Sequence, residues 1–292
     1  MRNHDTDLVS KDSVTASIKK LFSEHDGNTI SAEQAISPEL EGLRIYDEPL
    51  IGFGSASDPL FEEFKKTEAI GPWHMSPCEW LPQAKTVVSM FFPFTEEVRS
   101  SNRPQTDWPS SAWLHGRIEG QAFLNDYMKS LKEYFESKGI ETCVPSLDPR
   151  WEHTAAGRGK LKGYKEITDK TFSSRWSERH AAFVCGLGTF GLSKGLITEK
   201  GMAGRFASIL LPAGIEPDTR SYSEVYERCI QCGECVRRCP AGAITLEHGK
   251  DHSICSAMLQ EAGRRFSPRY GCGLCQTNVP CENRDPSKAI GK

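Results

Sequence analysis

The sequence predicts an α+β protein with two parts, an α/β domain over residues 1–220 and a smaller cysteine-rich domain over residues 221–292. Two observations predict this division. Apolar segments with the periods of strands and helices alternate in the first part, as in an α/β layer. Cysteines gather in the second part, where eight of the eleven lie between positions 229 and 281. The cysteine-rich part is short beside the chain of 292 residues, so most of the protein serves a further purpose.

The elements of the first part can be predicted in order along the chain. Residues 14–22 have the apolar spacing of an amphipathic helix. The continuous apolar run Val87–Phe92, ended by Pro93, predicts a buried strand. The remaining elements expected from composition and period are a loop over 100–111, a helix over 120–139 stopped by Gly139, and strands over 141–147 and 206–211.

Two segments of the first part are rich in glycine. In residues 150–180, glycines alternate with basic side chains, which fits either a loop that meets an anionic group, such as a nucleotide phosphate, or an ordinary solvated loop. In residues 177–212, the motif GLGTFG would let the backbone approach a flat ligand closely, although it gives little support to a dinucleotide site. The residues concerned are Gly157, Gly159, Gly163, Arg158, Lys160, Lys162, Lys165 and Lys170 in the first segment, and Gly186, Gly188 and Gly191 in the second.

Four cysteines in CIQCGECVRRCP have the CxxCxxCxxxCP spacing of ligands for a 4Fe-4S cluster. The two-residue gaps let three thiolates reach one cluster, while the fourth cysteine, followed by Pro240, ligates another. The crossover pattern of two-cluster ferredoxins therefore predicts two 4Fe-4S clusters. We assign Cys229, Cys232, Cys235 and Cys281 to the first, and Cys239, Cys255, Cys272 and Cys275 to the second.

Other uses of these cysteines fit the sequence less well. A zinc site would use four thiols and leave four idle, and a disulfide framework suits short secreted chains. The isolated cysteines Cys78, Cys143 and Cys185 are interpreted as small apolar core residues.

Charge and hydropathy limit the partners of the chain. The net charge of −3 and the isoelectric point near 6.3 give no general attraction to nucleic acid or membranes. The first twenty residues contain no apolar core of an export signal, and no run of about eighteen apolar residues occurs. Thiol-ligated clusters also favour a reducing compartment. We therefore expect a cytoplasmic protein with no membrane partner and no nucleic-acid partner.

The motifs ERHAAFVCGLGTFGLSKGLI, CxxCxxCxxxCPAGAI, SICSAMLQEAG and GCGLCQ occur in the order seen in epoxyqueuosine reductases and, more distantly, reductive dehalogenases. The resemblance covers about residues 80–282 and extends to LPQAKTVVSM and WLHGRIEGQAFLNDYMKSLKEYF. It implies a nitroreductase-like α/β domain that binds base-off cobalamin, followed by a ferredoxin-like double-cluster domain. The segment expected near the corrin comprises Cys185, Gly186, Gly188 and Gly191.

The chain departs from epoxyqueuosine reductases at two places. Their proposed acid, an aspartate before the Glu-Arg pair, is replaced here by the stretch Thr171, Phe172 and Ser173, with Asp169 as the nearest substitute. The last two cysteines lie in CQTNVPCE. Epoxyqueuosine reductases usually have three residues between these two cysteines and a proline after the second. No catalytic residue is therefore assigned, and His115, His153 and His180 are interpreted as surface or core histidines rather than cobalt ligands.

Two functions of different classes follow. The first is an iron–sulfur oxidoreductase, a cobalamin-dependent reductase of a small-molecule or RNA-borne substrate that receives electrons from a ferredoxin or flavodoxin. The second is a two-cluster electron-delivery protein for a corrinoid protein or another redox partner, without substrate turnover. The retained glycine segment favours the first and the missing acid favours the second. A flavin in place of cobalamin follows only from the analogy with nitroreductases.

Overall fold

A three-stranded antiparallel sheet forms the centre of the first part of the molecule. The computed structural model describes residues 9–154, 161, 164, 167 and 172–290. The strands β1 (Leu50–Ser55), β2 (Thr86–Pro93) and β5 (Gly204–Leu211) pair in the order β1-β2-β5. Every residue of β2 is buried because β2 is the central strand and both faces of the sheet are covered.

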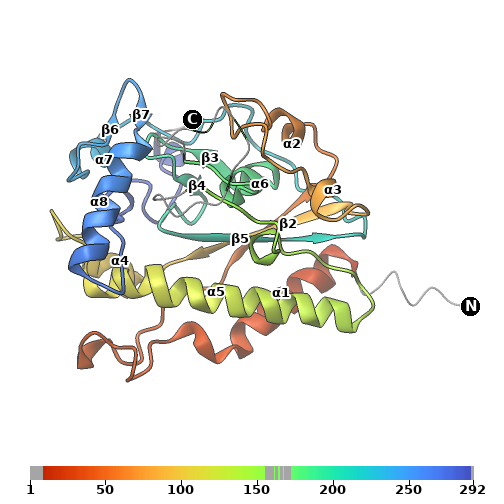
Figure 1. Ribbon diagram of the computed structural model, residues 1–292, viewed down its shortest axis with the longest axis horizontal. Helices are drawn as coiled ribbons and strands as arrows, with labels where there is room; N and C mark the ends of the chain where they lie inside the picture. Colours follow the sequence, from red (N-terminus) through yellow and green to blue (C-terminus); the bar gives the residue numbers. More distant parts are fainter. Residues whose placement is uncertain (1–8, 155–160, 162–163, 165–166, 168–171, 291–292) are drawn as a thin grey trace, which may run out of the picture.

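Two helices cover one face of the sheet (Figure 1). The helix α1 (Lys11–Glu24) and the long helix α5 (Ser111–Ser137) begin at serine caps, Ser10 and Ser110, whose hydroxyls accept backbone N–H groups of the first turn. Their apolar stripes pack against the side chains that β2 and β5 direct to this face. One aromatic contact in this core places the rings of Phe22 and Phe92 5.8 Å apart.

The opposite face of the sheet is covered by α6 (Glu178–Val184) and the short helices α2 (Leu60–Glu63) and α3 (Pro77–Trp80). Trp176, which precedes α6, stacks on Phe61 at 5.8 Å and lies in this second core. The sheet thus sits between two helical layers. The first turn of α6 is held against the middle of the sheet, where the Trp176 indole donates to the Ser208 hydroxyl of β5 at 3.0 Å.

The cysteine-rich part packs against one end of the sheet, beside the start of α5, where Figure 1 shows α8 in blue. Arg269 pairs with Glu119 of α5 at 2.6 Å, and Asn102 donates to Thr277 at 3.1 Å. These bonds hold the part to the rest of the chain. Its elements and the remaining ones are α4 (Glu96–Asn102), β3 (Gly188–Phe190), β4 (Leu196–Thr198), α7 (Glu234–Arg237), β6 (Ile244–Thr245), β7 (Gly249–Lys250), α8 (His252–Arg265), and 3-10 turns at Asp26–Asn28, Pro38–Leu40, Pro145–Leu147, Leu274–Gln276 and Ser287–Ile290.

The α+β class is confirmed, as are the first helix, the two strands β2 and β5, and the helix that ends before Gly139. That helix begins at Ser111, earlier than predicted. The strand predicted over 141–147 is wrong, because Pro145 opens a 3-10 turn and only Cys143 bridges β5. No helix within the described ranges is long and apolar enough to cross a membrane.

Candidate functional site

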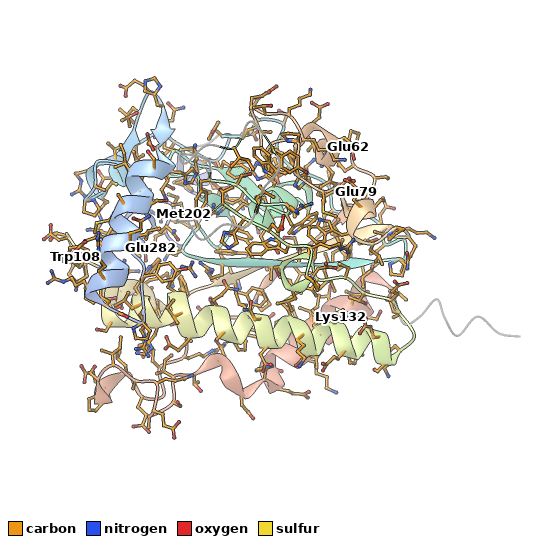
Figure 2. All side chains as sticks on the ribbon, in the orientation of Figure 1. Glu62, Glu79, Trp108, Lys132, Met202 and Glu282 are labelled. Atoms are coloured by element: carbon orange, nitrogen blue, oxygen red, sulfur yellow. The ribbon has the colours of Figure 1, made fainter. Side chains whose placement is uncertain are left out.

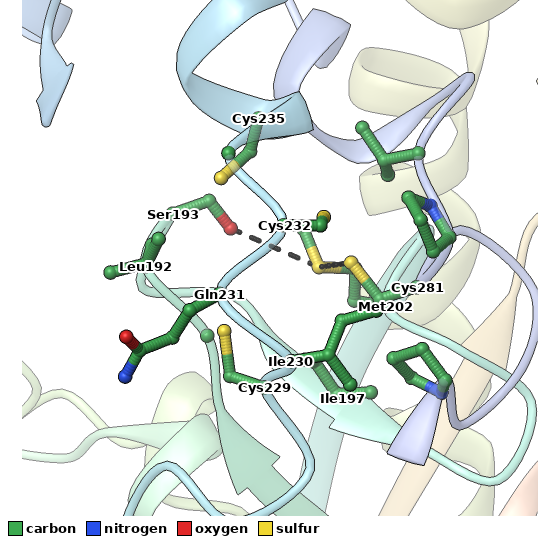
Figure 3. A pocket seen from close by; sticks show the side chains of 15 residues that line it. Leu192, Ser193, Ile197, Met202, Cys229, Ile230, Gln231, Cys232, Cys235 and Cys281 are labelled. Carbon is green, nitrogen blue, oxygen red and sulfur yellow. Dashed lines mark hydrogen bonds between the residues drawn. The ribbon is translucent and has the colours of Figure 1, made fainter. Parts of the chain in front are cut away.

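Four cysteines line one pocket at the end of the sheet (Figure 3). They are Cys229, Cys232, Cys235 and Cys281, the set assigned to the first cluster. Within the described ranges, no three His, Cys, Asp or Glu side chains close around a single metal ion. The four thiols instead share a mainly apolar pocket with side chains from β4 and the turn before β5.

The backbone around the first three cysteines allows their sulfurs to approach one another. Gln231 (φ 51°) and Gly233 (φ 75°) adopt left-handed conformations, so the chain turns sharply between Cys229 and Cys235. Gly233 then begins α7, and Cys235 lies in the first turn of that helix. This turn brings sulfurs that are separated by two intervening residues to one side of the chain, as the CxxCxxC spacing requires.

Cys281 is held at the same pocket by contacts with the turn between β4 and β5. The Met202 N–H donates to the Cys281 carbonyl at 2.9 Å, and the Met202 sulfur lies 3.5 Å from the Cys281 sulfur. Gly201 has φ 76°, and a side chain there would come within 2.3 Å of the Glu282 carbonyl oxygen. Only glycine allows this close approach. Figure 2 shows Met202 and Glu282 at the same end of the sheet, away from Glu62 and Lys132.

The second set of thiols has donors directed at its sulfurs. The Ala243 N–H donates to the Cys239 sulfur at 3.2 Å, and the Leu274 N–H bonds to Cys272. The Lys250 ammonium on β7 donates to Cys255 of α8. Backbone and side-chain donors of this kind stabilise sulfur that carries negative charge.

Electrostatic coupling groups the thiols in the same two sets. Burial, and next the thiols of Cys275, Cys255 and Cys239, raise the pKa of Cys272 to about 12. Burial, and next the thiols of Cys235, Cys229 and Cys232, raise the pKa of Cys281. Burial raises the pKa of Cys235, and the next cause is the Cys275 thiol of the second set, before Cys229 and Cys232, so the two sets adjoin. Metal binding would reverse these shifts, because iron binds the thiolate.

The other cysteines and the histidines play different parts. Cys143 and Cys185 are buried as predicted, but Cys78 is exposed at the start of α3, so its interpretation as a core residue is wrong. All eleven cysteines are free. His115 is a fully buried histidine with both nitrogens bonded, to the Ile36 N–H at 3.1 Å and to Glu119 at 3.0 Å.

The glycine motif approaches the chain's own backbone. A side chain at Gly188 would lie 2.0 Å from the Ile197 carbonyl oxygen, because β3 pairs with β4 there. The Gly188 N–H donates to the Tyr222 hydroxyl at 3.2 Å. Gly191 borders the first cysteine pocket, 3.2 Å from the Ile197 side chain. The space that glycine leaves here is already filled by protein.

The residues before the motif are also enclosed. The Cys185 thiol is buried, 3.4 Å from the Val87 carbonyl of β2. Gly186 has φ 78°, and a side chain there would meet Asp218 at 3.7 Å. The four residues of the predicted cobalamin segment therefore do not form an open cradle for a flat cofactor. The basic loop residues between 157 and 170, and Asp169, lie outside the described residues.

One buried carboxyl near the sheet escaped the sequence prediction. The Ser208 hydroxyl donates to Oε2 of Glu178 at 2.7 Å, while Oε1 is buried with no hydrogen-bond partner. Burial raises the pKa of Glu178 from 4.5 to about 7, against the opposing bonds from Ser208 and Trp176. Only the tertiary contacts of α6 with β5 enclose this carboxyl, since a glutamate in the first turn of a helix is ordinarily exposed.

This carboxyl gives a testable pH dependence of stability. The raised pKa of Glu178 means that the folded state holds a proton that the unfolded state loses above pH 4.5. Stability therefore falls as the pH rises from 4.5 to about 7, by about 3 kcal/mol at most, and then levels off. Thermal unfolding between pH 5 and 8 should show this loss, and Glu178→Gln should remove it. An unchanged pH profile in Glu178→Gln would assign the loss to another group.

Comparison with known proteins agrees with this geometry. The sequence profile of the 4Fe-4S binding domain family matches residues 223–245, which contain four of the cysteines. No curated protein sequence matches the chain at a significant level.

Solved structures share the fold. A selenomethionine-labelled epoxyqueuosine reductase is 20% identical, covers 80% of this chain and 61% of its own, and has a TM-score of 0.50. An epoxyqueuosine reductase with a tRNA-Tyr epoxyqueuosine-modified stem loop is 17% identical over 92% of this chain and 66% of its own, with a TM-score of 0.52. A catabolic reductive dehalogenase is 13% identical over 95% of this chain and 37% of its own, with a TM-score of 0.52.

The expected resemblance to epoxyqueuosine reductases and reductive dehalogenases is thus confirmed for the fold. The chain spans less than two thirds of the length of these structures.

Proposed function

We propose that this chain is an iron–sulfur oxidoreductase that holds two 4Fe-4S clusters and reduces a bound acceptor. The observation that carries the proposal is the gathering of Cys229, Cys232, Cys235 and Cys281 around one pocket, which the thiols of the second set adjoin. The 4Fe-4S binding domain profile covers four of these cysteines.

The residues fit the clusters. Cys229, Cys232, Cys235 and Cys281 would hold the first, and no described Asp, Glu or His lines their pocket. The cysteines with donors at their sulfurs would hold the second, namely Cys239, Cys255, Cys272 and Cys275. Bound clusters supply one-electron transfer at low potential.

The placement of the thiols suggests the direction in which electrons pass through the protein. Cys232 is exposed, so an electron-donor protein such as a ferredoxin or flavodoxin would meet the first set. Cys235 of the first set is coupled to Cys275 of the second. The second set faces the first turn of α6, because the thiols of Cys275 and Cys255 act on the pKa of Arg179 there. We therefore infer that the acceptor binds on the side of α6.

Cobalamin dependence is the finer form of the proposal. Motif order and the fold shared with epoxyqueuosine reductases and reductive dehalogenases support it, whereas the Cys185–Gly191 segment offers no open cradle. The substrate would be a small molecule, or an RNA-borne base, since one similar reductase was solved with a tRNA stem loop. The second candidate, an electron-delivery protein for a corrinoid or other redox partner, is favoured by the enclosed Cys185–Gly191 segment.

Anaerobic reconstitution with iron, sulfide and cobalamin tests the proposal. After gel filtration we expect about eight irons per chain, and one cobalt if the chain binds cobalamin. Eight irons without cobalt would support the iron–sulfur oxidoreductase and reject its dependence on cobalamin. Iron well below this number after complete reconstitution would overturn the two-cluster proposal.

A further inference from the structure

One methionine lies against a sulfur of the first cysteine set. Met202, in the turn between β4 and β5, lines the pocket of Cys229, Cys232, Cys235 and Cys281 and is only 3% exposed. Its sulfur lies 3.5 Å from the Cys281 sulfur. Its N–H donates to the Cys281 carbonyl at 2.9 Å, so both the backbone and the side chain hold Met202 beside the same cysteine.

The Met202 sulfur also accepts a hydrogen bond from a serine. The Ser193 hydroxyl donates to this sulfur at 3.8 Å, while the Ser193 oxygen accepts the Gly195 N–H at 3.3 Å. Figure 3 shows the contacts of Met202 with Ser193 and with Cys281 as two dashed lines that meet at the Met202 sulfur. The thioether is thus in contact with both the hydroxyl and the cysteine.

The turn that carries Ser193 leaves room for the thioether. A side chain at Gly195 would lie 3.1 Å from the Met202 methyl carbon and 3.3 Å from its sulfur, so a larger residue would press on Met202. The Gly191 N–H donates to the Gly195 carbonyl, and the Lys194 N–H donates to the Gly191 carbonyl, both at 2.8 Å. These bonds fix the turn and therefore the position of the Ser193 hydroxyl.

This hydroxyl matters because it lies among the thiols. Ser193 carries the one buried hydroxyl among the described residues that line the pocket. The other polar side chain beside the cysteines is that of Gln231, which is exposed and points away from the four sulfurs in Figure 3. A hydrogen bond to a cluster sulfur raises the reduction potential, because the reduced cluster carries one more negative charge. A free hydroxyl in this pocket would therefore raise the potential of a cluster bound there.

The second set lies in a different environment. The Ala243 N–H donates to the Cys239 sulfur at 3.2 Å. No described side chain donates to a sulfur of the first set, whose pocket is lined largely by apolar side chains such as Ile197 and Val279. Hydrogen bonding and solvent exposure both tune cluster potentials, so the structure favours a lower potential for the first cluster than for the second.

We propose that Met202 is a positioning residue that takes up the hydrogen bond of Ser193 and thereby keeps the reduction potential of the first cluster low. The inference rests on the proposed function, because it concerns a cluster held by the first set. Iron binds the thiolate, so Cys281 then has no proton to share with Met202, and the Ser193 hydroxyl is the donor left to the thioether. An electron that enters near the exposed Cys232 would pass downhill from the first cluster to the second.

Packing alone explains less. Leucine has nearly the volume of methionine and would fill the same space. Only the thioether also accepts a hydrogen bond. A residue needed only to fill the pocket would not have to lie in contact with both the hydroxyl of Ser193 and the sulfur of Cys281.

A potentiometric titration followed by electron paramagnetic resonance, on the anaerobically reconstituted protein, tests the inference. The Cys232→Ala variant, which is expected to lack the first cluster, identifies which potential belongs to that cluster. We expect Met202→Leu to raise this potential by about 59 mV, a tenfold change in the one-electron equilibrium, because the hydroxyl is released to a cluster sulfur. The potential of the second cluster should not change.

The matched control is Ser193→Ala. Alone it should leave the potential unchanged, because Met202 already holds the hydroxyl, and combined with Met202→Leu it should abolish the shift. A shift that persists in the double variant would assign the effect to water entry or repacking and would overturn the inference. An unshifted Met202→Leu, or a lower potential in Ser193→Ala alone, would overturn it as well. Met202→Ile, a second variant without sulfur, should repeat the shift and keeps the test decisive if leucine disturbs the fold.

Iron is counted in every sample, which separates this inference from the proposed function. About eight irons with an unchanged potential in Met202→Leu would reject only the role of Met202. Low iron in the wild type would reject the proposed function itself.

Discussion

Replacing Cys232 by alanine is expected to remove one cluster's worth of iron, so that reconstituted protein holds about four irons per chain instead of about eight. Cys232 lines the pocket with Cys229, Cys235 and Cys281, so alanine removes one of the four thiolates that would hold the first cluster and weakens its binding. Because cluster binding contributes to the folding of such domains, the cysteine-rich part should also unfold more readily. Iron and sulfide analysis, with limited proteolysis of the last part of the chain, measures both effects.

Cys78→Ala is the matched control for this experiment. Cys78 is also an exposed free cysteine, but it lies on α3 and its thiol only contacts the Ala84 carbonyl at 3.8 Å. It should retain the full iron content. Full iron in Cys232→Ala would contradict the ligand assignment, and iron loss in both variants would point to a general effect of removing a thiol.

Gly273→Ala is expected to destabilise the protein by more than about 3 kcal/mol and to impair the second cluster. Gly273 separates Cys272 from the turn that contains Cys275, and it has φ 70°. A side chain there would lie 1.9 Å from the Trp113 ring of α5. Both the left-handed backbone and the overlap with a buried ring oppose alanine. Thermal unfolding and the iron content of the purified variant measure the loss.

The variant Gly139→Ala separates the strain of the left-handed backbone from the overlap with Trp113. Gly139 has φ 77°, close to that of Gly273, but no atom lies within 4 Å of a side chain placed there. Alanine at this position should cost about 1 kcal/mol, the strain of the backbone alone, with no effect on iron. Equal losses in the two variants would show that the contact with Trp113 contributes nothing.

Much of the fold could be predicted because local patterns carry it. The apolar run of β2 and the helical stripe of α5 both have one period over many residues. The segment 141–147 was predicted wrongly because its apolar residues fit a strand, while Pro145 and the single bridge of Cys143 decide otherwise. The strand β1 was missed, since Gly52 and Gly54 interrupt its pattern. These glycines admit Cys185, which packs against them from α6.

The cysteine spacing by itself determined the kind of cofactor chemistry, because thiols separated by two intervening residues can converge through local turns alone. The tertiary structure decided which distant groups meet. Only the turn at Gly201 brings Cys281 to the first pocket. Only the packing of α6 on β5 encloses the Glu178 carboxyl, which accepts a hydrogen bond from the Ser208 hydroxyl. Glutamate is ordinarily a surface residue, and its burial here depends on chain segments far apart, which no local period records.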